Sequence, residues 1–329
     1  MPDAVPVIDL APFLCGRDCG GVARAIDAAC RQFGFLMVTG HRVPAADIAR
    51  MHTTAATFFD RPEDEKRRVQ VPAGQIHGWT GAGRSRLADT LQAPGGEGAP
   101  PDLKETFSIG PLDTPPDVSP QEAPYFGRNL WPPQPAGLRD AARVYYRHME
   151  ILAATLMRAM AMGLDLEEHY FGDRIDRHIT GLAVHHYPAQ PSAPGPWQLR
   201  AGAHTDFGSL TILHPGGNPG GLQVWSGHTW IDVTPPADAF VINVGDLLAQ
   251  WTNDRWRSTL HRVVNPPAAR AGLARQSITF FHQPNWHTVV ECLPGCGDGR
   301  YAPVTSGAHF EAKLARLRGT PPAPSADQA

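Results

Sequence analysis

The chain has 329 residues, enough for one large domain or two small ones, and 42% of them are hydrophobic, close to the globular average. Lysine and arginine number 29 against 32 acidic residues, so the net charge of -3 gives no indication of nucleic acid or an anionic membrane as a partner. The apolar run Ile151–Met162 contains Arg158 and is too short to cross a bilayer. The N-terminal stretch contains Asp3 and Asp9 and lacks the basic region that is typical of a signal peptide. We therefore expect a soluble cytoplasmic protein.

The first 135 residues are expected to form a helical and loop region. Hydrophobic spacing, with proline before a helix and glycine after one, marks its elements. These are an extended stretch over Val5–Leu10, a helix over about Val22–Phe33, a strand over Phe35–Val38 and a helix over Ala45–Phe59.

Residues 70–135 are rich in glycine and proline, which disfavours long regular elements and indicates surface loops. Trp79 and Arg84, in the stretch Gly78–Arg86, are candidates for a lid over a substrate. Lys104 and Glu105 are expected to be a solvated charge pair.

The strongest predicted helix covers Leu138–Leu164 and supports the core as part of a segment over residues 136–178. From residue 179 to 318, short runs rich in Val, Ile, Thr, Phe and Trp alternate with turn residues, a pattern typical of an antiparallel sandwich or barrel. A last helix is predicted over Ala308–Arg318, and residues 319–329 are expected to be a disordered tail. The predicted fold class is therefore α+β with a mainly β core of the jelly-roll type.

A metal site is predicted from His204, Asp206 and His261. Residues two apart on a strand share a face, so His204 and Asp206 can offer a nitrogen and an oxygen to one ion. His261, in a strand-like context further along, can complete a two-histidine, one-carboxylate set. This set leaves adjacent positions on Fe(II) open for a chelating cosubstrate and O₂.

Arg275 and Ser277 follow in the next predicted strand and again share one face. A guanidinium fork beside a hydroxyl suits a carboxylate. 2-Oxoglutarate matches this arrangement, because one end chelates iron and the other ends in a carboxylate. The order of the two motifs favours an iron and 2-oxoglutarate site.

Taken together, these motifs resemble the isopenicillin N synthase-like iron(II)/2-oxoglutarate dioxygenases over nearly the whole chain. The resemblance implies a double-stranded β-helix, His204, Asp206 and His261 as iron ligands, Arg275 and Ser277 as the cosubstrate clamp, and Tyr187 as a supporting contact. Further motifs in the family's order are Val5–Leu10, Thr39–His41, Asp102–Phe107, His186–Pro188, Gly220–Val224, Asn243–Asp246 and Trp251–Asp254. The position three before Pro188 is His185, where many plant members have asparagine.

The implied activity is oxidation of a C–H bond in a small molecule of secondary metabolism or amino-acid origin, with release of succinate and CO₂. Alternation predicts that one of His185 and His186 faces the pocket. Other candidate substrate contacts are Phe107, Phe207, Phe281 and Gln283. The five cysteines are expected to be incidental rather than a zinc site.

Several alternatives stay open from the sequence. One is an oxidase that dispenses with 2-oxoglutarate, since isopenicillin N synthase also carries an arginine-x-serine pair. A second is ethylene formation from 2-oxoglutarate, because Gly202–Asp206 and Gly307–Phe310 are similar to the bacterial ethylene-forming enzyme. Two others are a non-catalytic binding or sensing module on the same scaffold, and zinc hydrolysis. Neither the substrate nor the oligomeric state is indicated.

Overall fold

Two β-sheets face each other in the computed structural model, which describes residues 4–91, 98–190, 192–217 and 220–317. The expected tail, residues 319–329, lies outside these ranges. The large sheet has the order β1 (Val7–Asp9), β2 (Phe35–Thr39), β10 (Phe240–Val244), β7 (Leu210–His214), β12 (Arg275–His282), β5 (Gly181–Tyr187), β4 (Glu105–Ile109) and β3 (Gly78–Thr80). The small sheet has the order β6 (Ala201–His204), β11 (His261–Val263), β8 (Leu222–Trp225) and β9 (Trp230–Asp232).

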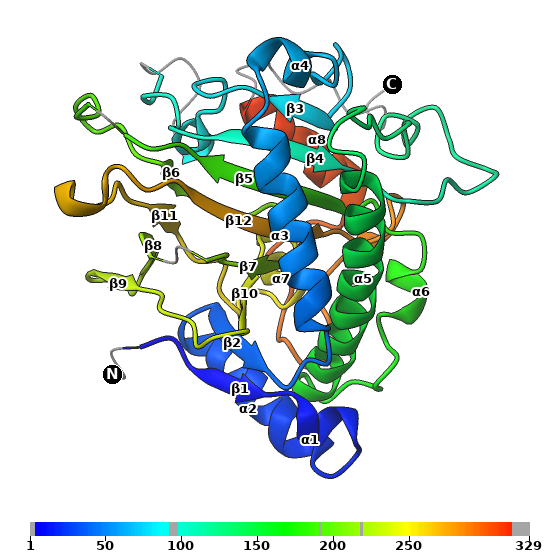
Figure 1. The fold of residues 1–329 in the computed structure, drawn as a ribbon. Coiled ribbons are helices and arrows are strands. Elements are labelled where there is room, and N and C mark those ends of the chain that lie inside the picture. Colours follow the sequence, from blue (N-terminus) through cyan, green and yellow to red (C-terminus); the bar gives the residue numbers. More distant parts are fainter. Residues whose placement is uncertain (1–3, 92–97, 191, 218–219, 318–329) are drawn as a thin grey trace.

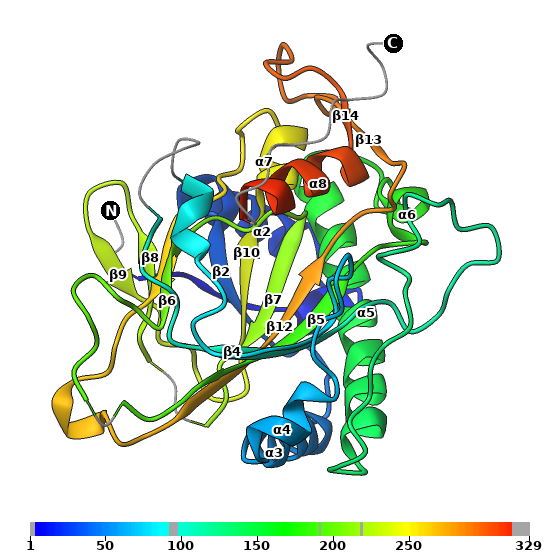
Figure 2. The ribbon, with the colours of Figure 1, turned by 90° about the horizontal axis from the view of Figure 1, so that it is seen from above.

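Helices cover the outer face of the large sheet (Figure 1). The helices α3 (Ala45–Phe59) and α5 (Leu138–Gly163) lie across this face, and α2 (Cys19–Gln32) packs against α5. The last helix, α8 (Ser306–Leu317), lies instead against the 3-10 turn η1 (Leu87–Leu91), as Figure 2 shows. The remaining elements are α1 (Ala11–Leu14), α4 (Glu63–Arg67), α6 (Gly172–Ile175), α7 (Asp246–Trp251), η2 (Ala268–Arg270), and the strand pair β13 (Val289–Val290) and β14 (Val304–Thr305).

Strand alternation divides the side chains of the large sheet between two environments. On β12, Ile278 and Phe280 pack into the main hydrophobic core under the helices, while Thr279 and Phe281 point into the space between the sheets. Neighbouring strands follow the same alternation in register, because each strand pairs antiparallel with the next except β1 with β2. One face of the sheet thus builds the core, and the other forms the wall of a cavity between the sheets.

The predicted fold class is confirmed, with one correction to the organisation. The N-terminal region does not only pack on the β core, since it supplies β1, β2, β3 and β4 to the large sheet. The last two of these come from the glycine- and proline-rich stretch for which the sequence predicts surface loops. None of the helices in the described ranges is both long enough and apolar enough to span a membrane.

Two expectations for this stretch are wrong. Trp79 is not part of a lid: it lies buried in β3, where its indole N–H donates to Glu105 Oε2 at 2.8 Å. Lys104 and Glu105 are both buried and point to opposite faces of the sheet. Glu105 pairs with Lys66 Nζ at 2.8 Å on the helix side, whereas Lys104 lines the cavity.

Candidate metal centre and its cavity

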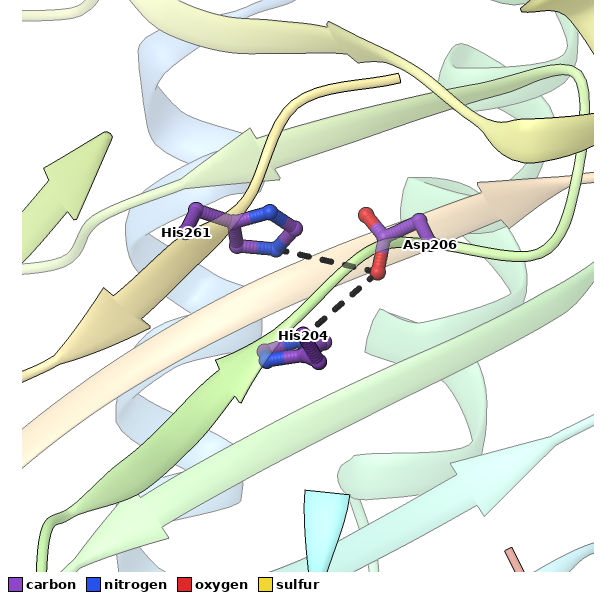
Figure 3. A group of neighbouring side chains, drawn as sticks. All are labelled: His204, Asp206 and His261. Atoms are coloured by element: carbon purple, nitrogen blue, oxygen red, sulfur yellow. Dashed lines mark ion pairs between the residues drawn. The ribbon is translucent and has the colours of Figure 1, made fainter. Parts of the chain in front are cut away.

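Three potential metal ligands converge between the two sheets (Figure 3). His204 is the last residue of β6 and pairs in register with His261, the first residue of β11. Asp206 lies just beyond the strand, in the loop that leads to β7. One ligand atom from each residue lies within 4.8 Å of the others, so the chain folds the predicted set into a single site.

The hydrogen bonds around the two imidazoles leave one nitrogen of each ring for a metal. His204 Nδ1 lies 2.7 Å from the carbonyl oxygen of Gly202, and His261 Nδ1 lies 3.1 Å from that of Thr259. Since a carbonyl oxygen only accepts, each Nδ1 carries the proton and each Nε2 keeps its lone pair. Both Nε2 atoms lie 3.8 Å from Asp206 Oδ1, around a common point (Figure 3).

Asp206 is held by two side chains that the sequence analysis did not single out as support. Its Oδ2 accepts from Thr211 Oγ1 at 2.6 Å and from Asn243 Nδ2 at 2.8 Å. Thr211 and Asn243 are register partners on β7 and β10 of the large sheet. The large sheet therefore fixes the carboxylate, the small sheet fixes the imidazoles, and Oδ1 is left facing both rings.

Electrostatics keep His204 and Asp206 in the protonation states that a divalent cation needs. Burial and the neighbouring His261 lower the pKa of His204 to about 3, which keeps its imidazole neutral. Burial by itself raises the pKa of Asp206, but the two imidazoles and the hydrogen bonds from Thr211 and Asn243 lower it overall. Two neutral imidazoles and one carboxylate are the ligand set of non-haem Fe(II) oxygenases, so the residues present fit a ferrous ion.

The predicted clamp residues lie together at one end of β12. Arg275 and Ser277 are buried, and Arg275 Nη1 donates to Ser277 Oγ at 3.4 Å. The guanidinium carbon lies 4.8 Å from the ring centre of Tyr187, its register partner on β5. Arg200 was not predicted from the sequence, and its guanidinium carbon lies 5.9 Å from the same ring centre. Two buried cations therefore gather near Tyr187. Arg275 Nε donates to the carbonyl oxygen of Gly220 and Arg200 Nη2 to that of Leu273, and neither has an acidic partner among the described residues.

A cavity of about 840 Å³ contains the converging ligand atoms. Besides the three ligand residues, its lining includes the predicted contacts Tyr187, His185, Phe207, Phe281 and Gln283. Arg275 and Ser277 are not in the lining themselves, but they share a face of β12 with Thr279 and Phe281, which are.

Phe107 is the exception among the predicted substrate contacts. It points to the helix side of β4, where its ring centre lies 5.0 Å from that of Phe58 in the main core. The expectation for Phe107 is therefore wrong, because the polar residues of β4, Thr106 and Ser108, take the cavity side. For the histidine pair, His185 lines the cavity and His186 stacks on Phe59 on the opposite face.

His204, Asp206 and His261 form the single metal-type cluster in the part of the chain that the structure describes. The cysteine pairs Cys15/Cys19 and Cys292/Cys296 do not join into a thiolate site, and all five cysteines are free. The cavity wall also contains residues that sequence reasoning did not select as contacts. They are Phe310 and Leu314 of α8, His77, Arg86 and Lys104.

Two models of known protein families match this chain. Residues 5–134 match the family model described as the N-terminal region of non-haem dioxygenases in morphine synthesis, and residues 179–284 match the 2OG-Fe(II) oxygenase superfamily. The chain belongs to the 2OG-Fe(II) oxygenases. The resemblance inferred from the sequence is therefore confirmed.

Individual relatives agree with this assignment. Validamycin A dioxygenase of Streptomyces hygroscopicus subsp. limoneus is 34% identical over 85% of this chain and 77% of that protein. The 2-oxoglutarate-Fe(II) type oxidoreductase hxnY of Emericella nidulans is 32% identical over 92% of this chain and 87% of that protein. The crystal structure of a full-length Neurospora crassa protein in complex with alpha-KG superposes with a TM-score of 0.81 at 31% identity, covering 94% of this chain and 96% of the Neurospora chain.

This oxygenase is thus an oxidoreductase that uses Fe(II), 2-oxoglutarate and O₂, as predicted. The 2-oxoglutarate-independent, sensing and zinc-hydrolase alternatives have no support from these relatives. Solved relatives include the same Neurospora protein with alpha-KG and thymine, and JOX2 with 2OG, Fe and JA, so proteins of this fold hold small-molecule substrates.

Proposed function

We propose that this 2OG-Fe(II) oxygenase oxidises a C–H bond of a small organic molecule held in the cavity beside His204, Asp206 and His261. The observation that carries the proposal is the convergence of His204 Nε2, His261 Nε2 and Asp206 Oδ1 inside a cavity large enough for a small molecule. Bound Fe(II) and 2-oxoglutarate supply the oxidising power by consuming O₂ and releasing CO₂ and succinate.

In this proposal each side of the cavity has its own task. The two imidazoles and Asp206 bind iron, and the hydrogen bonds to Asp206 Oδ2 keep Oδ1 aimed at it. Arg275 and Ser277, with Tyr187 against the guanidinium, bind the far carboxylate of 2-oxoglutarate and so orient its chelating end. The apolar side chains Phe207, Phe281 and Phe310 exclude water around the reacting carbon.

Titration of the anaerobic Fe(II) protein with 2-oxoglutarate tests the assignment. A visible metal-to-ligand charge-transfer band is expected, and loss of that band with loss of bound iron is expected in His204→Ala and Asp206→Ala. A wild-type protein that binds iron but forms no band would contradict the role of 2-oxoglutarate at this site. Headspace analysis of the aerobic reaction distinguishes substrate oxidation from ethylene release, the runner-up that the sequence left open.

The clamp has a separate test in Arg275→Leu. This variant should keep iron and weaken 2-oxoglutarate binding by at least about tenfold, since a charge-assisted contact of about 2–5 kcal/mol is removed. Arg158→Leu is the matched control. The guanidinium carbon of Arg158 also lies over an aromatic ring, 5.7 Å from the ring centre of Phe13, but Arg158 is outside the cavity lining. Equal loss of iron in Arg275→Leu and Asp206→Ala would instead make Arg275 a structural residue.

The setting in which the enzyme works is also part of the proposal. A cytoplasmic location is supported by the five unpaired cysteines, which persist in a reducing compartment. One relative is named Validamycin A dioxygenase, and the Neurospora protein has been solved with thymine. These names support a small-molecule substrate rather than a macromolecule, and with it a role in secondary metabolism.

A further inference from the structure

The chain contains three lysines, and two of them form ion pairs with carboxylates whereas Lys104 does not. Lys66 Nζ pairs with Glu105, and Lys313 Nζ pairs with Asp246 Oδ2. Lys104 is only 6% exposed, yet no described residue accepts a hydrogen bond or forms an ion pair with its ammonium group. Because Lys104 lines the cavity, a ligand bound there is the available partner for its ammonium group.

The position of Lys104 indicates where a partner for its ammonium group would lie. It directly precedes β4 and shares a strand face with Thr106 and Ser108, and all three residues line the cavity. His185, on the neighbouring strand, is the register partner of Thr106, and its Nδ1 forms a hydrogen bond with the Thr106 hydroxyl at 3.0 Å. Lys104 therefore belongs to a polar strip on the β4 and β5 wall, beside the metal centre.

The charges of the cavity lining do not balance without a ligand. Its cations are Lys104, Arg84 and Arg86, whereas its carboxylates are Asp89 and Asp206. Asp206 belongs to the metal centre, and Asp89 Oδ1 accepts from the backbone N–H of Ala99 at 2.6 Å rather than from Lys104. Arg84 and Arg86 are exposed, so Lys104 is the buried cation of the lining that faces the space left for substrate without a carboxylate partner among the described residues.

Another part of the cavity wall is apolar. The side chains of Phe207, Phe310 and Leu314 line it, the last two from α8, and Leu87 of η1 adds to it. A ligand that satisfies both parts of the wall carries a negative group at one end and a hydrocarbon body at the other.

We propose that the substrate is an organic acid whose carboxylate is bound by Lys104 while its apolar body packs against Phe207, Phe310 and Leu314. This inference rests on the proposed function, because it assigns the remaining cavity space to the substrate once the cosubstrate is held by Arg275. Lys104 is then a specificity-determining residue, because it selects acids over their neutral analogues. By holding the carboxylate, it also orients the substrate so that the end farther from Lys104 is oxidised.

Matched acid and amide pairs test the inference by calorimetry on the anaerobic enzyme loaded with Fe(II) and 2-oxoglutarate. The pairs are hexanoate and hexanamide, benzoate and benzamide, and 2-naphthoate and 2-naphthamide, which differ in charge but little in shape. At least one acid should bind ten times or more tighter than its amide in the wild type. Lys104→Met should abolish that preference and leave amide binding unchanged, and Lys104→Arg should retain it.

Three outcomes would overturn the inference. They are a wild type that prefers no acid over its amide, a Lys104→Met variant that keeps the preference, and a variant that loses acid and amide together. The charge-transfer band with 2-oxoglutarate is recorded on each sample. An intact band with failed discrimination refutes only the role of Lys104, whereas a missing band in the wild type refutes the proposed function. A Lys104→Met variant with weakened 2-oxoglutarate binding but unchanged acid preference assigns the ammonium to the cosubstrate instead.

Discussion

Thr211→Val isolates the contribution of the large sheet to the metal centre. The substitution keeps the shape of the side chain and removes the 2.6 Å hydrogen bond to Asp206 Oδ2, leaving the one from Asn243 at 2.8 Å. A hydrogen bond to a charged group is worth about 1.5–3 kcal/mol. Since about 1.4 kcal/mol corresponds to a factor of ten in affinity, Fe(II) binding should weaken by roughly 10- to 100-fold, the range typical of partners that orient metal ligands.

The assay is anaerobic competition for Fe(II) against a chromophoric chelator at pH 7.5, with the unfolding temperature measured in parallel. Thr279→Val is the matched control, because Thr279 is also a buried, cavity-facing threonine but its Oγ1 has no hydrogen-bond partner among the described residues. It should bind iron as the wild type does. Unchanged iron affinity in Thr211→Val, or an equal loss in both variants, would refute the reasoning that Thr211 acts through Asp206.

Two further predictions concern stability. Burial lowers the pKa of His77 from 6.5 to about 4, so unfolded His77 takes up a proton before folded His77 does and stability is lost as the pH falls below 6.5. His77→Leu should therefore reduce the loss of unfolding free energy between pH 7 and pH 5 by about 2 kcal/mol in urea titrations; an unchanged pH dependence would show that His77 is not the group responsible. Glu105→Ala leaves the buried Lys66 without its carboxylate and should cost about 3–5 kcal/mol. Glu63→Ala is the control: it breaks the ion pair with Arg67, in which both side chains are more than 60% exposed, and should cost less than about 1 kcal/mol of unfolding free energy. Equal losses of unfolding free energy in the two variants would count against the role of burial.

The site chemistry was largely readable from the sequence. His-x-Asp, a later histidine and an arginine-x-serine pair are local patterns, and strand alternation makes each pair share a face wherever the strand is placed. The structure differs in one detail, since β6 ends at His204 and Asp206 lies in the following loop. The family, the fold class and the cosubstrate chemistry followed from the order of these motifs.

Tertiary structure decided which face of each strand meets which neighbour. The period of β4 separates Lys104, Thr106 and Ser108 from Glu105 and Phe107, but both faces of this strand are covered, one by helices and one by the cavity. Local sequence cannot tell two buried faces apart. For this reason the sequence alone puts Phe107 in the pocket and Lys104 in solvent, and both expectations are wrong.

The same limit applies to the partners of the metal ligands. Thr211 and Asn243 reach Asp206 because β7 and β10 pair in register opposite the small sheet, and that pairing depends on contacts between segments far apart in the chain. The sequence by itself thus determined the candidate ligand set and the candidate clamp pair. The packing of the two sheets and of α8 decided what surrounds them, because an element's neighbours are set by long-range burial rather than by its own residues.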